Sequence, residues 1–227
     1  MPIELPSPNH GPRAPGATVD LLILHYTGMR SCEEALARLT DPAAQVSAHY
    51  VVGEDGTVWR LVPEERRAWH AGVGSWQGER EVNGRSVGIE LVNPGHEWGY
   101  RPFPPAQMDA LADLARAVMG RHGIAPERVL GHSDVAPSRK EDPGELFDWQ
   151  GLARIGVGIW ADAPESREDD SDCAGMLGRY GYETDGPGGV RAALTAFQRH
   201  FAPTSLGRDW DAAQAGTLRA LLERVGR

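Results

Sequence analysis

Apolar residues cluster along the first part of the chain in runs whose lengths are typical of short strands. Residues 19–25 read Val-Asp-Leu-Leu-Ile-Leu-His, an apolar run that suits a buried central strand. Residues 86–92 form a second such run, and residues 129–132 indicate a short strand end. Residues 49–52 and 57–61 flank the sequence Gly-Glu-Asp-Gly, which predicts a β-hairpin with an Asp-Gly turn.

Helical signals lie between these strands. A serine and glutamate spaced as a capping box precede residues 32–40 and predict a short helix there. Residues 105–122 carry apolar side chains at helical spacing, and Gly123 supplies a C-cap. Residues 1–18 are rich in proline and glycine and predict an extended lead-in, whereas residues 71–84 predict glycine-rich loops.

The last third of the chain predicts a smaller helical unit. Residues 161–172 are acidic and nearly free of large apolar side chains, which indicates a linker. Three short helices follow, the last from about Asp209, and we expect this small bundle to pack on the first domain. The fold class is therefore α/β, a mixed β-sheet flanked by helices with a small C-terminal three-helix domain. The expected domains are residues 1–160 and 173–227.

Composition and charge narrow the range of partners. The net charge is −9 and no run of lysine or arginine occurs, so we expect neither nucleic acid nor an anionic membrane surface as a partner. No secretory signal is visible at the N-terminus, and no segment reaches the roughly 18 apolar residues of a membrane span. These features favour a cytoplasmic protein without membrane insertion, and a periplasmic or secreted location reached by another route stays open. Cys32 and Cys173 lack metal-ligand spacing and are expected to be free thiols. Oligomeric state stays open.

Three side chains are candidate metal ligands. His25 ends the first apolar run, His132 ends a second predicted strand, and Asp142 follows in the sequence Asp-Pro-Gly. Two imidazoles and one carboxylate suit a catalytic zinc ion, which keeps its fourth position for water. Each residue alone also suits an ordinary role, as a hydrogen-bonded histidine or as a turn aspartate. Spacing alone leaves that choice open.

The residues around these candidates form several sequence blocks in a fixed order. The blocks are Leu24–Thr27, Val46–Tyr50, Ala68–Gly72, Ser86–Leu91, Gly131–Asp134 and Lys140–Gly144. In this order and spacing, residues 15–155 resemble the zinc-dependent N-acetylmuramoyl-L-alanine amidases of the AmpD and AmiD type. The resemblance implies hydrolysis of the amide bond between N-acetylmuramic acid and L-alanine in peptidoglycan or in its soluble fragments, the muropeptides. It also implies that His25, His132 and Asp142 bind Zn²⁺.

The same resemblance implies two catalytic residues, Glu90 and Lys140. Glu90 would take a proton from the attacking water and later give it to the leaving amine. Lys140 would stabilise the oxyanion of the tetrahedral intermediate. Taken alone, Glu90 also suits a hydrogen-bonded glutamate of a sheet, and Lys140 a solvated loop cation.

Four further residues are weaker candidates for substrate binding. The resemblance places Trp69, His70 and Asn83 in the groove that holds the sugar and the peptide. Trp69 offers an apolar face to a sugar ring but equally suits a core position, and His70 and Asn83 offer hydrogen bonds. For His49, a place in the pocket wall and a structural hydrogen-bonding role are equally compatible with the sequence.

The C-terminal unit also resembles a known module. Residues 177–182, 193–201 and 217–221 follow the pattern of the three-helix peptidoglycan-binding module. Most of the matching positions are core positions that any small bundle needs, so binding of wall polymer and a purely structural cap both stay open. For the whole chain we expect an amidase of cell-wall recycling. The alternatives are a non-catalytic peptidoglycan-binding or sensing protein and a secreted wall-lytic effector.

Overall fold

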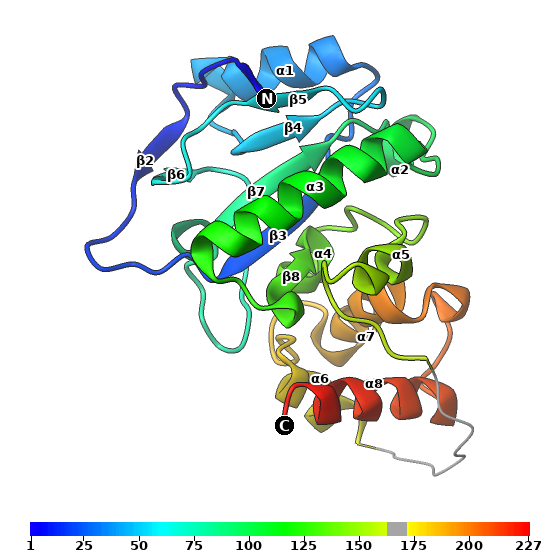
Figure 1. Cartoon of the computed structure of the whole chain (residues 1–227). Coiled ribbons are helices and arrows are strands. Elements are labelled where there is room, and N and C mark those ends of the chain that lie inside the picture. Colours follow the sequence, from blue (N-terminus) through cyan, green and yellow to red (C-terminus); the bar gives the residue numbers. More distant parts are fainter. Residues whose placement is uncertain (163–171) are drawn as a thin grey trace.

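The computed structural model describes residues 1–162 and 172–227, and a six-stranded mixed sheet lies at its centre (Figure 1). In their order across the sheet, its strands are β1 (Ile3–Glu4), β5 (Val58–Arg60), β4 (Tyr50–Val52), β7 (Ser86–Leu91), β3 (Leu21–Tyr26) and β8 (Val129–Gly131). β4 and β5 form the expected antiparallel hairpin. β3 runs parallel to both β7 and β8, and β4 runs parallel to β7. The expected mixed sheet is confirmed.

The first residues of the chain contribute more than an extended lead-in. β1 pairs with β5 at the edge of the central sheet, and β2 (His10–Pro12) pairs with β6 (Arg66–Ala68) in a separate two-stranded sheet. Strands of two or three residues are too short to show an alternating pattern. The proline and glycine content of this segment also points away from strands, which is why the sequence alone predicted none here.

Both helices predicted in the first domain are present. α1 (Cys32–Thr40) begins where the hydroxyl of Ser31 accepts a hydrogen bond from the N–H of Glu34. α3 (Pro105–His122) ends at Gly123, whose φ of 67° is left-handed. The other helices are α2 (Gly95–Trp98), α4 (His132–Val135), α5 (Trp149–Arg154), α6 (Cys173–Tyr180), α7 (Gly189–Phe201) and α8 (Ala212–Arg224).

Alternation along the central strands divides the sheet into two faces. α3 covers one face of the sheet (Figure 1). Leu22 and Leu24 of β3 belong to the large apolar core that also contains buried residues of α3. Ile23 and His25 point to the opposite face, since side chains two residues apart share a face. The parallel register pairs His25 with Glu90 of β7, so Glu90 lies on this second face as well.

The three C-terminal helices pack on part of the second face. Leu21, Ile23 and Trp76 share one cluster of buried apolar side chains with α6, α7 and α8. The buried members from these helices include Met176, Leu194, Phe197, Leu218 and Leu221. The helical unit is therefore packed on the first domain, as expected, through a continuous core.

Two details of the C-terminal unit refine the prediction. α8 begins at Ala212 rather than near Asp209, because the side chain of Asp211 caps the helix by accepting from the N–H of Gln214. Of the predicted linker at residues 161–172, the part from 163 to 171 lies outside the described residues. The division into two domains stays a prediction.

A buried polar joint also links the C-terminal unit to the sheet. Asp134 of α4 accepts three hydrogen bonds, all of 2.7 Å, from the N–H of Gly131, the hydroxyl of Tyr182 and Nδ1 of His200. The ring of His200 stacks on Trp149 with 3.7 Å between ring centroids. Asp134 lies two residues after His132, so this joint reaches the segment that carries a candidate metal ligand.

Two expectations about the chain as a whole can be compared with the structure. Both cysteines are free thiols, as expected. Within residues 1–162 and 172–227, the structure contains no helix of the length and apolar character that a membrane crossing requires.

Candidate metal centre and active site

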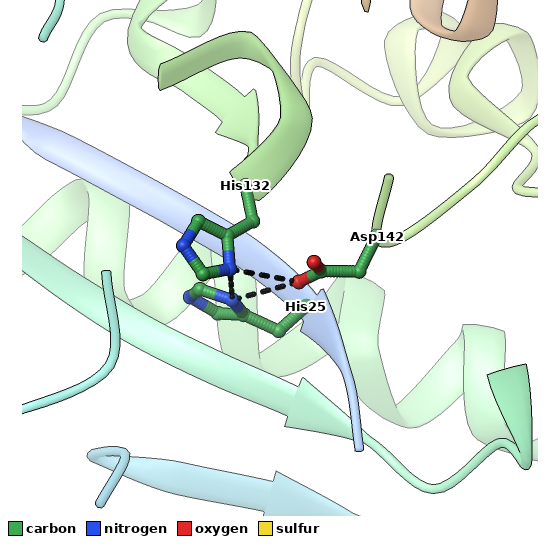
Figure 2. A group of neighbouring side chains, drawn as sticks. All are labelled: His25, His132 and Asp142. Atoms are coloured by element: carbon green, nitrogen blue, oxygen red, sulfur yellow. Dashed lines mark hydrogen bonds and ion pairs between the residues drawn. The ribbon is translucent and has the colours of Figure 1, made fainter. Parts of the chain in front are cut away.

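The three candidate ligands converge at the carboxyl ends of β3 and β8. Figure 2 shows the two imidazoles and the carboxylate pointing toward one another. Nδ1 of His25 lies 3.0 Å from Nδ1 of His132 and 3.0 Å from Oδ2 of Asp142. Nδ1 of His132 lies 3.1 Å from the same oxygen. All three residues are buried, and together they could hold a metal ion.

Strand register explains how distant residues meet here. The parallel ladder pairs Leu24 of β3 with Gly131 of β8, so His25 and His132 each follow a paired position at the same end of the sheet. The carboxyl ends of parallel strands are where open α/β sheets place their sites. The carbonyl of Asp142 accepts a hydrogen bond of 2.9 Å from the N–H of Ser133, which ties the loop of the third ligand to α4.

Burial and neighbouring charges prepare these groups for a cation. Burial, reinforced by the nearby His132, lowers the pKa of His25 to about 4, so this imidazole is uncharged at neutral pH. Burial alone would raise the pKa of Asp142. The imidazoles of His132 and His25 outweigh burial and hold the pKa of that carboxyl well below its usual range. A neutral imidazole and a carboxylate are the forms in which these side chains bind metals.

The hydrogen-bond partners and the distances fit a tetrahedral ion. Nε2 of His132 lies 2.9 Å from the carbonyl oxygen of Ala71, so Nε2 donates and Nδ1 keeps a lone pair. That lone pair faces the carboxylate of Asp142. Two electron-rich atoms at this distance repel each other, and a cation between them stabilises the arrangement. Ligand atoms at ~2.0–2.1 Å from a tetrahedral zinc ion lie roughly 3.3–3.4 Å apart, so the separations of 3.0–3.1 Å need only a slight expansion.

Glu90 lies beside this centre on the neighbouring strand. Its Oε2 is buried and has no hydrogen-bond partner among the described residues. Burial raises the pKa of Glu90 well above its usual range, the charge of Asp142 adds to this rise, and Lys140 opposes it. A buried carboxylate oxygen without a partner costs free energy in a folded protein, which is typical of a group kept for chemistry.

One cavity of about 360 Å³ joins the metal centre to the catalytic candidates. His132, Asp142 and Glu90 line it, and the exposed Lys140 stands at its wall. The partly buried Trp69 also lines this cavity, consistent with a role in holding a sugar ring. With His70, the structure therefore brings six of the predicted residues, from four segments of the chain, to the wall of one cavity.

The remaining weak candidates lie partly or wholly behind the cavity wall. His70 lines the cavity, but Nδ1 of His70 contacts His25 at 3.0 Å and Nε2 contacts Ser86 at 3.1 Å. Burial lowers the pKa of His70 well below its usual range, and the neighbouring His25 adds to this effect. The side-chain oxygen of Asn83 accepts from the backbone N–H groups of His70 and Ala71. This oxygen thus supports the backbone of the cavity wall, and contact of Asn83 with substrate stays a prediction.

The surroundings of His49 fit a structural hydrogen-bonding role. The side chain is fully buried, and Nδ1 accepts a hydrogen bond of 2.9 Å from the N–H of Gly88. Nε2 then donates to the carbonyl oxygen of Arg66 at 3.0 Å. With both ring nitrogens occupied inside the protein, these contacts favour the structural role of the two that the sequence left open for His49.

Sequence reasoning missed the residues that support the metal ligands. Ser86 contacts His70, and the carbonyl of Ala71 contacts His132. The signal for Ser86 was present, because Ser86, Gly88 and Glu90 alternate along one strand and therefore share the face of the site. A backbone carbonyl such as that of Ala71 leaves no such signal, since every residue carries one.

Comparison with known proteins identifies the family of this chain. The family model described as N-acetylmuramoyl-L-alanine amidase matches residues 15–145. N-acetylmuramoyl-L-alanine amidase AmiD of Escherichia coli is 39% identical over 92% of this chain and 84% of its own length. The 1,6-anhydro-N-acetylmuramyl-L-alanine amidase AmpD of the same organism is 35% identical over 64% of this chain and 87% of its own length.

Solved structures show the same fold over nearly the whole chain. E. coli AmiD, in complex with anhydro-N-acetylmuramic acid-L-Ala-D-gamma-Glu-L-Lys, superimposes with a TM-score of 0.82 over 94% of this chain and 93% of its own, at 39% identity. AmpDh3 of Pseudomonas aeruginosa, in complex with anhydromuramic pentapeptide, gives a TM-score of 0.81 over 91% and 92%, at 31% identity. The chain belongs to the N-acetylmuramoyl-L-alanine amidase family.

Proposed function

We propose that this amidase uses one zinc ion, held by His25, His132 and Asp142, with Glu90 and Lys140 as its catalytic residues. The reaction is hydrolysis of the amide bond between N-acetylmuramic acid and L-alanine. The observation that carries the proposal is the meeting of three ligand atoms within 3.1 Å, in a cavity that also contains a buried carboxylate oxygen without a partner.

The ligand set favours zinc over calcium and magnesium. Two imidazole nitrogens and one carboxylate oxygen form the three-ligand set of catalytic zinc sites, whereas calcium and magnesium prefer oxygen ligands alone. Zinc supplies Lewis acidity, which lowers the pKa of a bound water toward about 7 and polarises the amide carbonyl.

Glu90 is placed for proton transfer. Because Oε2 has no hydrogen-bond partner among the described residues, it is free to accept a proton from the attacking water. The same carboxyl can then give this proton to the nitrogen of L-alanine as the amide bond breaks. Burial raises the pKa of Glu90 above its usual range, which suits a group that must both take and release a proton.

Lys140 is placed to bind the developing oxyanion. Its side chain is exposed at the cavity wall, two residues before Asp142, so the ammonium group can reach a substrate bound at the metal centre. A hydrogen bond from this cation to the carbonyl oxygen strengthens as negative charge develops there. Donors of this kind typically contribute about 10²–10³ in kcat.

The substrates that we propose are soluble muropeptides, including those with a 1,6-anhydro sugar. The relatives support this proposal, since AmiD and AmpDh3 were solved with anhydromuramyl peptides and the AmpD proteins are named for the anhydro sugar. Such fragments arise in cell-wall recycling. A location in the cytoplasm stays a prediction, which cell fractionation would test. Binding of wall polymer by the C-terminal unit also stays a prediction.

The decisive experiment compares two glutamate variants. Glu90→Gln should retain stoichiometric zinc and lose about 10²–10⁴ in kcat, because the amide cannot carry the proton. Glu141→Gln is the matched control, since Glu141 lines the same cavity but pairs with Arg199 at 3.3 Å. Mass spectrometry of products from a mixed muropeptide pool, with and without chelator, measures both variants.

Three results would count against the proposal. An active Glu90→Gln variant would remove Glu90 from catalysis, and activity that survives complete metal removal would remove the zinc. Digestion of intact sacculi without turnover of small fragments would overturn the recycling substrate and favour a wall-lytic enzyme.

A further inference from the structure

We propose that Ser86 and His70 form a hydrogen-bond relay that fixes the tautomer of His25, so that His25 presents Nδ1 to the metal as a lone pair. The inference rests on the proposed zinc site and deepens it. It assigns Ser86 and His70 as positioning residues, which act on the metal through His25. The relay starts at the backbone carbonyl of Val82 and ends at the metal centre.

The hydroxyl of Ser86 has two neighbours, and its one hydrogen goes to the carbonyl of Val82. Its Oγ lies 2.6 Å from the carbonyl oxygen of Val82. A carbonyl only accepts and a hydroxyl has one hydrogen, so the hydroxyl of Ser86 donates to Val82. The lone pairs that remain on Oγ face Nε2 of His70 at 3.1 Å. Nε2 of His70 therefore carries the hydrogen of that contact.

The hydrogen on Nε2 of His70 in turn determines which nitrogen of His25 carries hydrogen. With its ring hydrogen on Nε2, His70 keeps a lone pair on Nδ1, which lies 3.0 Å from Nε2 of His25. Nε2 of His25 must supply the hydrogen of this contact, which leaves Nδ1 of His25 as the free lone pair. That atom is the one that faces His132 and Asp142.

The surroundings of His70 hold its ring in place for this role. A Cβ at position 88 would lie 2.4 Å from Cγ of His70, so only glycine at this point of β7 leaves room for the ring. Asn83 accepts from the N–H groups of both His70 and Ala71, and the carbonyl of Ala71 accepts from Nε2 of His132. One dipeptide, His70-Ala71, thus sets the hydrogen positions of both histidine ligands.

Breaking the relay has a defined chemical consequence. Without the hydroxyl of Ser86, His70 is free to carry its hydrogen on Nδ1 and to donate it to Nε2 of His25. The hydrogen of His25 then moves to Nδ1 and blocks the atom that binds the metal. Loss of such outer partners typically lowers metal affinity about 10- to 100-fold.

The first test reads the tautomers directly in the metal-free wild-type chain. In protein labelled with ¹⁵N-histidine, two-bond ¹H–¹⁵N correlation spectra show which ring nitrogen carries hydrogen. We expect the Nε2–H form for His25, His70 and His132. An Nδ1–H form of His25 or His70 would overturn the relay. This readout depends on neither activity nor a variant that must fold.

The second test compares two replacements of His70 by zinc titration against a competing chelator. In His70→Asn, the side-chain oxygen takes roughly the position of Nδ1 and still accepts from Nε2 of His25. His70→Leu fills a similar volume without an acceptor. We expect about 10- to 100-fold weaker zinc binding for His70→Leu and a loss below about 3-fold for His70→Asn. Ser86→Ala should weaken zinc binding in the same direction as His70→Leu.

The outcomes separate this inference from the proposed function. If His70 only fills space, the leucine variant would bind zinc as well as or better than the asparagine variant, which would overturn the relay. If the wild-type chain binds no zinc but shows the three Nε2–H tautomers, the proposed zinc site fails while the relay is supported.

Discussion

Replacing Asp134 by alanine should destabilise the fold by about 4 kcal/mol and loosen the segment that carries His132. The carboxylate is fully buried and accepts three hydrogen bonds of 2.7 Å, from Gly131, Tyr182 and His200. Alanine leaves three buried donors without an acceptor, at about 1–3 kcal/mol each. Relaxation of the structure and entry of water reduce this sum. The loss of folding free energy should therefore resemble that of breaking a buried ion pair, about 3–5 kcal/mol.

Equilibrium unfolding in guanidinium measures this loss of stability. Two further variants test whether the loss comes from the hydrogen bonds of Asp134. Tyr182→Phe removes one donor and should cost about 1–2 kcal/mol. Asp113→Ala is the matched control, because Asp113 is exposed on α3 and forms a surface ion pair with Arg116, so its effect should stay below about 0.5 kcal/mol. For Asp134→Ala we also expect weaker zinc binding in the chelator titration.

One outcome would refute this reasoning about the joint. If Asp134→Ala unfolds within about 1 kcal/mol of the wild type, the three hydrogen bonds do not stabilise the contact between the C-terminal helices and the sheet. Unchanged zinc affinity in a strongly destabilised variant would show that the joint supports the fold but not the metal centre.

Three further outcomes are expected. Lys140→Met should lower kcat by about 10²–10³ with little change in zinc content, as steady-state kinetics and metal analysis would show. Adding zinc at about 100 times its Kd should raise the free energy of unfolding by about 2.7 kcal/mol relative to the metal-free chain. Burial would raise the pKa of Glu64, but hydrogen bonds from Arg121, Tyr50 and His122 lower it to about 2. The folded pKa lies below the unfolded value of about 4.3, so the stability that ionised Glu64 contributes is present above that value and is lost as pH falls toward 2. The difference in unfolding free energy between wild type and Glu64→Gln should therefore shrink between pH 5 and pH 2.

The sequence predicted the long elements better than the short ones. The apolar run of β3 and the helical spacing of α3 were sufficient to place both within a few residues. β1, β2 and β6 have only two or three residues, so they depend on pairing with strands distant in sequence. The order of the strands was not predicted either, because it depends on contacts across the sheet.

The site shows a similar division. His25 and His132 stood out because ionisable side chains ended apolar runs, and the structure brings both to Asp142. The family resemblance, which rests on sequence blocks, placed Asn83 in the substrate groove, and the sequence left His49 open between the pocket wall and a structural role. In the structure, the ring of His49 and the side-chain oxygen of Asn83 support the wall from behind. Sequence blocks of this kind do not distinguish a residue that touches substrate from one that holds such a residue.

The apolar cluster shared by the sheet and the C-terminal helices limits how this chain can be shortened or recombined. α6, α7 and α8 help to cover Leu21, Ile23 and Trp76, so a shortened chain would have to cover these three side chains by other means or replace them with polar residues. Trimming this chain at residue 160 would leave these three side chains open to water. The helical unit therefore cannot be transferred to another protein alone, because the apolar surface on which it packs must be transferred with it.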